Sequence, residues 1–346
     1  MNSTFKEIPL RQILYVSLAG ENRISCWSIN SNDGKLEHLA DTKVSERPAP
    51  LAADIQNSIL YVGRRDLPCV SSYKFDSSSG ELIHLSDGPT LEGDPCYISL
   101  DKTNTYILSA YYEAGAVSVH SVDNGVFGDE KVWKTTGNGA HCVLTDADNS
   151  YALVPHIAGE KGINKILKYS FNQTTGNLDP MDIPSLSQPD NRGPRHYTFH
   201  PNGNYVFFSN EQESSVTAYG YQKGNLDELQ TLSTLPAHYG GVNTCAQIKI
   251  TPDGKYIYAP NRGHNSIAGF SVDSNTGELN MNGRTQTEAM PRVLDIDKNG
   301  NFLYSAGLDT GYISVFKIKN DGSLEFIDRF EVGEEPMWIL ILPVTE

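Results

Sequence analysis

Arginine, histidine and glutamate side chains mark the ends of two short apolar runs in the middle of the chain. Arg195 and His196 begin the first run, and Glu211 follows the second. An arginine can bind phosphate or carboxylate through its planar fork of donors, and a glutamate or histidine can take up a proton. The Pro-Asn-Gly sequence between the runs predicts a tight β-hairpin. Because a hairpin returns the chain to its starting level, we expect these side chains to lie on one face.

The same hairpin recurs along the chain, and its seven copies predict the architecture. The second residue of the apolar run that ends each copy is Tyr15, Tyr61, Leu108, Leu153, Phe207, Tyr258 and Tyr304. A further β-rich run and a Gly-centred turn follow each of them. A period of about 40–50 residues rich in Tyr, Val and Ile is typical of four-stranded propeller blades. The sequence therefore predicts an all-β fold, a seven-bladed β-propeller that forms a single domain over residues 1–346.

The two ends of the chain predict how the ring closes. Residues 13–17 read as the second strand of a unit, and residues 336–343, PMWILILP, read as a first strand without a hairpin partner. We expect the C-terminal strand to complete the N-terminal blade, because this pairing leaves no open edge in the ring.

One rim of the predicted ring concentrates ionisable residues. Six of the equivalent positions at the starts of first strands and the ends of second strands are ionisable: Arg65, His141, Arg195, Glu211, Arg262 and Arg292. The turns at the opposite end, such as the one that begins at Asp297, are expected to be plain connectors. The charged rim favours a site for a small anionic, oxygen-rich ligand, with structural ion pairs between blades as the alternative for any single residue.

Composition restricts the class of partner. The 346 residues include 27 Lys and Arg against 42 Asp and Glu, for a formal charge of −15. So acidic a chain is a poor candidate for binding nucleic acid or an anionic membrane. We see no signal peptide and no run long enough to span a membrane, and the five cysteines form no CxxC pair. These features predict free thiols and a cytoplasmic protein, either a monomer or a weak homodimer.

Four segments carry a resemblance to a known family. GPRHYTFHPNGNYVFFSNEQESSVTAY, ITPDGKYIYAPNRGHNSIAGFSVD, MPRVLDIDKNGNFLYSAG and GEEPMWILIL resemble the lactonase family of seven-bladed propellers, and the resemblance runs from Ile13 to the C-terminus. This family includes 6-phosphogluconolactonases and carboxy-cis,cis-muconate cyclase. The resemblance implies hydrolysis of a sugar lactone, with 6-phospho-D-glucono-1,5-lactone as the favoured substrate. It also implies that four residues carry the function: His141, Arg195, Glu211 and Arg262.

Further residues are expected to contact the substrate. These are Arg64, Arg65, Tyr112, His156, His196, Gln247 and Arg292. Two departures from the family leave the substrate open: Gln247 stands where relatives often carry an acidic residue, and His156 is followed by an inserted AGEKGIN. A phosphate, carboxylate or sulfonate on the lactone would suit the same arginines.

Lactone hydrolysis needs an activated water and a stabilised oxyanion. Glu211, His141 or His196 is expected to take the water proton, and Arg195 or Arg262 to stabilise the oxyanion. The sequence has no GxSxG elbow, so we do not expect nucleophilic catalysis by a serine. We expect no cofactor and no metal, because there is no HExxH motif and the pair His196 and His200, four apart on a predicted strand, is more typical of packing than of metal ligation. The alternatives are a lactonase for another anionic or neutral sugar lactone, a muconate lactone cycloisomerase, and a non-enzymatic binding propeller.

Overall fold

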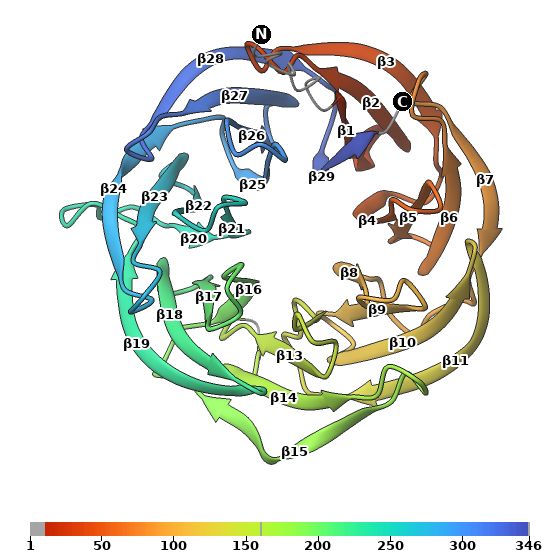
Figure 1. Cartoon of the computed structure of the whole chain (residues 1–346), viewed down its shortest axis with the longest axis horizontal. Coiled ribbons are helices and arrows are strands. Elements are labelled where there is room, and N and C mark those ends of the chain that lie inside the picture. Colours follow the sequence, from red (N-terminus) through yellow and green to blue (C-terminus); the bar gives the residue numbers. More distant parts are fainter. Residues whose placement is uncertain (1–10, 160, 345–346) are drawn as a thin grey trace, which may run out of the picture.

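The computed structural model describes residues 11–159 and 161–344, and these form seven β-sheets arranged in a ring (Figure 1). We number the sheets as blades around the ring. Blade 1 consists of β29 (Pro336–Val344), β1 (Arg11–Leu18), β2 (Arg23–Ile29) and β3 (Leu36–Lys43). Blade 2 consists of β4 (Pro48–Asp54), β5 (Ile59–Arg64), β6 (Cys69–Phe75) and β7 (Leu82–Asp87). Blade 3 consists of β8 (Tyr97–Leu100), β9 (Tyr106–Tyr111), β10 (Ala116–Asp123) and β11 (Val126–Thr135).

The remaining four blades follow the same order from the axis outward. Blade 4 consists of β12 (Leu144–Thr145), β13 (Tyr151–His156), β14 (Lys165–Phe171) and β15 (Leu178–Ser187), and blade 5 of β16 (Pro194–Phe199), β17 (Tyr205–Asn210), β18 (Ser215–Gln222) and β19 (Asn225–Ser233). Blade 6 consists of β20 (Thr244–Cys245), β21 (Lys249–Ile250), β22 (Tyr256–Arg262), β23 (Ser266–Val272) and β24 (Leu279–Gln286). Blade 7 consists of β25 (Pro291–Ile296), β26 (Phe302–Gly307), β27 (Tyr312–Ile318) and β28 (Leu324–Glu331). In blade 6 the innermost strand is split into β20 and β21. A short 3-10 helix, η1 (Ala19–Glu21), follows β1.

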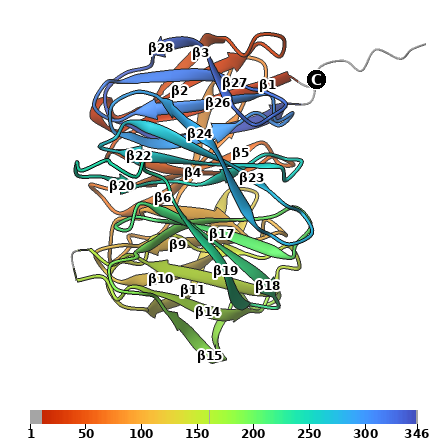
Figure 2. The same ribbon diagram turned by 90° about the vertical axis from the view of Figure 1, so that its left-hand side faces the viewer.

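The predicted seven-bladed β-propeller is confirmed. Figure 2 shows the blades edge-on as one disc. Second strands such as β1 are buried along nearly their whole length, because neighbouring blades cover both of their faces, whereas outer strands such as β3 are largely exposed or half-buried. Among the described residues, no helix is long and apolar enough to cross a membrane.

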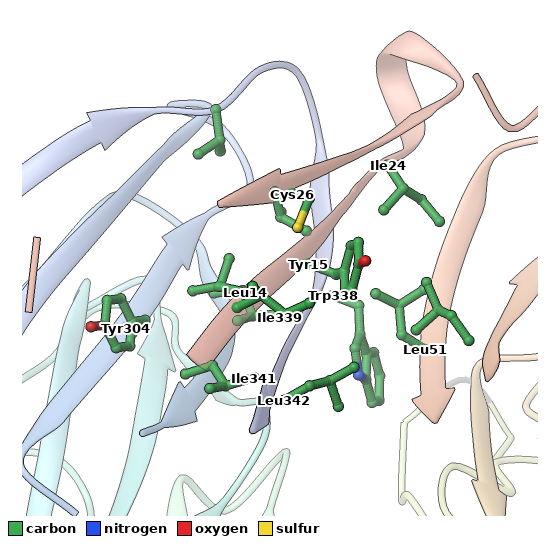
Figure 3. Packing of buried hydrophobic residues seen from close by; sticks show 14 of the residues in the cluster. Leu14, Tyr15, Ile24, Cys26, Leu51, Tyr304, Trp338, Ile339, Ile341 and Leu342 are labelled. Carbon is green, nitrogen blue, oxygen red and sulfur yellow. The ribbon is translucent and has the colours of Figure 1, made fainter. Parts of the chain in front are cut away.

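Ring closure occurs where the sequence predicts it. β29 pairs antiparallel with β1 from Arg11 opposite Val344 to Leu18 opposite Pro336. On the axis, β29 lies between β25 and β4. The side chains of this closing strand pack with those of β1 in one buried cluster that includes Tyr15, Trp338 and Ile339 (Figure 3). The last strand therefore joins blade 1 to both of its neighbours.

The tyrosine and the Gly turn that recur in the sequence form hydrogen bonds with each other between neighbouring blades. The Tyr304 hydroxyl donates to the Gly34 carbonyl at 2.8 Å, and the Tyr15 hydroxyl donates to the Gly80 carbonyl at 3.1 Å. Each bond ties one blade to the Gly turn of the next. Gly34 has a φ of +74°, and a Cβ there would lie 2.5 Å from the Phe302 ring. Only glycine fits both the left-handed backbone and the close approach.

The turns at the opposite end of the ring also hold blades together. Asp297 Oδ1 accepts hydrogen bonds from the backbone N–H groups of Asn301 and Phe302, and Asp297 Oδ2 accepts one from Gln12 Nε2 of the next blade at 3.3 Å. Asp101 Oδ2 accepts a similar bond from Asn149 of its neighbouring blade at 2.7 Å. The prediction that these turns are plain connectors is therefore wrong.

Candidate functional site

Four blades begin their innermost strand with a proline followed by a β-bulge. In blade 5, Pro194 pairs with Asn210 and His196 pairs with Ser209, so Arg195 is the extra residue. Arg292 is the extra residue of blade 7, and Met337 has this place in blade 1. Blade 2 shifts register between Pro48 and Leu51, around Ala49 and Pro50. Proline cannot donate to the ladder, which suits it to a bulge.

These bulges turn their extra residues toward the axis. Ala49, Arg195, Arg292 and Met337 all line one cavity, and Cys96, which follows Pro95 in blade 3, lines it as well. The cavity is narrow, with a volume of about 10 Å³, which is room for about one water molecule. Its full lining is Ala49, Pro50, Arg65, Cys96, Arg195, His196, Gln247, Arg292, Val293, Met337 and Trp338. The repeated bulge thus builds the site, as bulges beside active sites often do.

A glutamate held between two arginines lies beside this cavity. Arg195 Nε lies 2.7 Å from Glu211 Oε2, and Arg262 Nη2 lies 2.9 Å from Glu211 Oε1. Arg262 Nη2 also donates to the Cys245 carbonyl at 2.9 Å. The side chains of Arg195, Arg262 and Glu211 are only 2%, 10% and 14% exposed, so both ion pairs are largely shielded from water.

The charges of Arg195 and Arg262 keep the Glu211 carboxyl group ionised. Burial raises the pKa of Glu211, but Arg195 and Arg262 outweigh burial and leave that pKa below its usual value. Burial lowers the pKa of Arg195 to about 10, which still leaves it charged at neutral pH. Glu211 is therefore an anion with both oxygens engaged, and it is a weak base.

The cluster carries more positive than negative charge. Arg65 is neutralised by Asp94, whose Oδ2 accepts from Arg65 Nε at 2.6 Å. Within the described part of the chain, no carboxylate lies within ion-pair distance of Arg292. Burial, together with the charges of Arg195 and Arg262, lowers the pKa of Arg292 to about 9. Three arginines against Glu211 leave two excess positive charges, which an anionic ligand would compensate.

Two neutral histidines lie against the arginines. The ring centroids of His141 and His196 are 5.2 Å apart. Arg195 Nη1 donates to His196 Nε2 at 3.2 Å, so this nitrogen is unprotonated. Burial and the charges of Arg195 and Arg292 hold the pKa of His141 well below its usual value, and burial with Arg195 does the same for the pKa of His196. His141 Nδ1 is buried without a hydrogen-bond partner among the described residues.

The structure brings together most of the eleven predicted site residues. Those that line the cavity are Arg65, Arg195, His196, Gln247 and Arg292. His141, Glu211 and Arg262 contact this group, and the Tyr112 ring centroid lies 5.8 Å from that of His141. The side chain of Gln247 accepts from the Leu294 N–H at 3.0 Å, which fixes its place in the wall.

Arg64 and His156 lie apart from the cluster, with hydrogen-bond partners of their own. Arg64 donates to Cys69 Sγ on the adjacent strand and lies 3.3 Å from Asp87. His156 hydrogen-bonds the Val154 carbonyl and the Thr136 hydroxyl, both at 3.0 Å. Each immediately precedes a rim position, and successive residues of a strand point to opposite faces.

Sequence reasoning missed the aromatic part of the site. Trp338 lines the cavity, and Tyr97 lies against both Trp338 and His196. A signal for these residues was present, because RPAPL, DPCYI, GPRHY, MPRVL and EPMWI repeat a Pro-X pair at the start of an innermost strand. No group of three His, Cys, Asp or Glu residues within 11–159 and 161–344 is arranged to hold a metal ion.

Comparison with known proteins agrees with this architecture. The sequence model of the family described as Lactonase, 7-bladed beta-propeller matches residues 14–341. The 6-phosphogluconolactonase of Enterobacter sp. (strain 638) is 31% identical over 336 residues, covering 96% of this chain and 99% of the relative. That of Klebsiella pneumoniae (strain 342) is 30% identical over 335 residues, with the same two coverages.

A solved structure shows the same fold. The periplasmic gluconolactonase of Pseudomonas aeruginosa superposes with a TM-score of 0.89 at 24% identity, covering 97% of this chain and 100% of that one. The family match spans nearly every strand of the ring, from β1 to β29. This chain therefore belongs to the lactonase family of seven-bladed β-propellers.

Proposed function

We propose that this protein hydrolyses a phosphorylated sugar lactone, 6-phospho-D-glucono-1,5-lactone, to 6-phosphogluconate. The names of its full-length relatives support the reaction, and one observation of the site supports the charge of the substrate. That observation is the cluster of Arg195, Arg262 and Arg292 against the single carboxylate of Glu211. A phosphate carries close to two negative charges at neutral pH, which matches the two excess positive charges.

The arginines divide between two tasks in this proposal. Arg292 has no carboxylate partner among the described residues and lines the cavity, so it is the contact for the phosphate. Arg195 also lines the cavity and is fixed by Glu211 and His196, so it stabilises the oxyanion that forms on the lactone carbonyl. A preorganised donor in this role is typically worth about 3–4 kcal/mol. Glu211 positions Arg195 and Arg262.

His141 is the general base of the proposed reaction. Its imidazole is neutral and therefore able to accept a proton, whereas Glu211 is held by two arginines. An anionic substrate would offset the charges of Arg195 and Arg292, which depress the pKa of His141, and so would raise its basicity on binding. His141 takes a proton as water oxygen bonds to the lactone carbon. It returns that proton to the ring oxygen as the ring C–O bond breaks, which leaves a hydroxyl and a carboxylic acid.

The proposal also includes the cellular compartment and the oligomeric state. The cysteines of the described chain, Cys26, Cys69, Cys96, Cys142 and Cys245, are all free and buried, which fits a reducing cytoplasm. We expect the protein to act there as a monomer or weak homodimer on a small sugar lactone, without nucleic acid or membrane partners.

A pH-stat assay tests the proposed function. Hydrolysis of freshly prepared 6-phosphogluconolactone releases acid, and the wild-type protein should accelerate this release far above the spontaneous rate. Arg292→Met should lower kcat/KM by about 100-fold, the effect of losing a charged hydrogen bond of up to about 3 kcal/mol. Arg64→Met is the matched control, because Arg64 lies outside the cluster, and it should retain the wild-type kcat/KM. A wild-type rate equal to the spontaneous rate would refute the proposal.

A further inference from the structure

The cavity has two chemically different walls. Arg195 and Arg292 contribute cationic groups to the lining, and Met337 and Trp338 of the closing strand β29 contribute an apolar surface together with Val293 of β25. Met337 and Trp338 are 6% and 7% exposed. A ligand in this cavity therefore meets cations and an aromatic ring at once.

The Trp338 ring is held in place by two other rings. Its centroid lies 5.3 Å from that of Tyr97 at an interplanar angle of 76°, and 6.1 Å from that of His196. Tyr97 and His196 are 5.0 Å apart at 82°. Such edge-to-face contacts are favourable and restrict the orientation of the rings.

A sugar lactone suits this pair of walls. Its ring has C–H-rich faces that can pack on an aromatic surface, and its hydroxyl and phosphate groups can face arginine donors. Inorganic phosphate can use only the arginines. We propose that Trp338 is the platform against which the lactone ring packs, and hence a specificity-determining residue of the reaction. This inference rests on the proposed function for the identity of the ring.

Tryptophan fluorescence tests contact with the ring directly. The chain has three tryptophans, of which Trp338 lines the cavity, Trp27 packs against His38 and Trp133 packs against Tyr111. Titration with 6-phosphogluconate should change the emission of the wild-type protein and of Trp133→Phe, but not that of Trp338→Phe. An emission change that persists in Trp338→Phe would overturn the proposal.

Kinetics separate a platform from a purely structural residue. Trp338→Leu should raise KM for the phosphorylated lactone roughly tenfold, equivalent to about 1.4 kcal/mol, and leave kcat within about threefold. The inhibition constant of inorganic phosphate, which lacks a ring, should stay unchanged. A wild-type KM in Trp338→Leu would overturn the proposal, and if that variant does not fold, the KM of Trp338→Phe decides in the same way.

The two proposals fail in distinguishable ways. An active wild-type enzyme whose emission ignores 6-phosphogluconate contradicts the platform and leaves the proposed function standing. A protein without turnover whose emission responds to this sugar acid, with the response lost in Trp338→Phe, contradicts the function and supports the platform.

Discussion

Replacing Glu211 by glutamine removes the charge that holds Arg195 and Arg262 together. Glutamine has nearly the same shape, so the change isolates charge from volume. Removing one partner of a buried ion pair costs about 3–5 kcal/mol. Because the Glu211 side chain is 14% exposed, water can replace part of the lost contact, and we expect the free energy of unfolding to fall by about 3 kcal/mol.

The same change should separate catalysis from anion binding. Without Glu211, the guanidinium of Arg195 is no longer fixed, and kcat should fall about 100-fold, as on loss of one preorganised donor. The excess charge of the cluster rises from two to three, so inorganic phosphate should inhibit more strongly. Urea unfolding measures the stability, and pH-stat rates with and without phosphate measure the other two quantities.

A second buried glutamate provides the control. Glu288 lies 3.1 Å from Arg329 and accepts from the Ser314 hydroxyl at 2.8 Å, away from the cavity lining. Glu288→Gln should lower stability without changing kcat. Wild-type turnover in Glu211→Gln would refute the role of Glu211. Loss of the acid limb of the pH–rate profile in Glu211→Gln would show that Glu211, and not His141, is the base.

Three further predictions concern the scaffold. Burial lowers the pKa of His156 to about 4 in the folded protein, whereas in the unfolded chain this imidazole takes up a proton below about pH 6.5. Because the unfolded state binds the proton first as the pH falls, the free energy of unfolding should be at its full value above pH 6.5 and should decrease by about 3 kcal/mol between pH 6.5 and pH 4. Urea titrations across this range should show the loss, His156→Gln should reduce it, and a flat wild-type profile would contradict a neutral buried imidazole. Deleting residues 337–346 removes most of β29 and should abolish cooperative thermal unfolding; an unchanged transition would disprove closure by this strand. Tyr304→Phe should cost about 1 kcal/mol by leaving the Gly34 carbonyl unpaired, and equal unfolding midpoints would rule out that contribution.

The architecture was readable from the sequence because its signals are local and repeated. Each copy contains a hairpin and a Gly turn, and the tyrosine of one copy bonds to the turn of the next, as Tyr304 does with Gly34. The hairpin also places Arg195 beside Glu211, since strand pairing at short range fixes both ends of a two-stranded unit. Strand pairing at short range therefore made the fold and part of the site predictable from the sequence.

The rest of the site depends on features that a repeat alignment does not contain. Arg64 and Arg65 are adjacent in sequence, and the alternation of side chains sends one to Cys69 and the other to Asp94. Trp338 reaches the cavity because the last strand closes the ring beside distant blades. The two ion pairs that weaken Glu211 as a base follow from distances between blades, which sequence spacing does not give.

The ratio of kcat/KM for 6-phosphogluconolactone to that for glucono-1,5-lactone tests the central claim most directly. Both are six-membered lactones, so they differ mainly in the phosphate that two uncompensated arginine charges are expected to bind. Measured by pH-stat in phosphate-free medium, the ratio should be at least about 100, equivalent to about 2.7 kcal/mol. It should fall toward one in Arg292→Met. A wild-type ratio near one would contradict the account, because the excess positive charge of the cavity would then have no part in selecting the substrate.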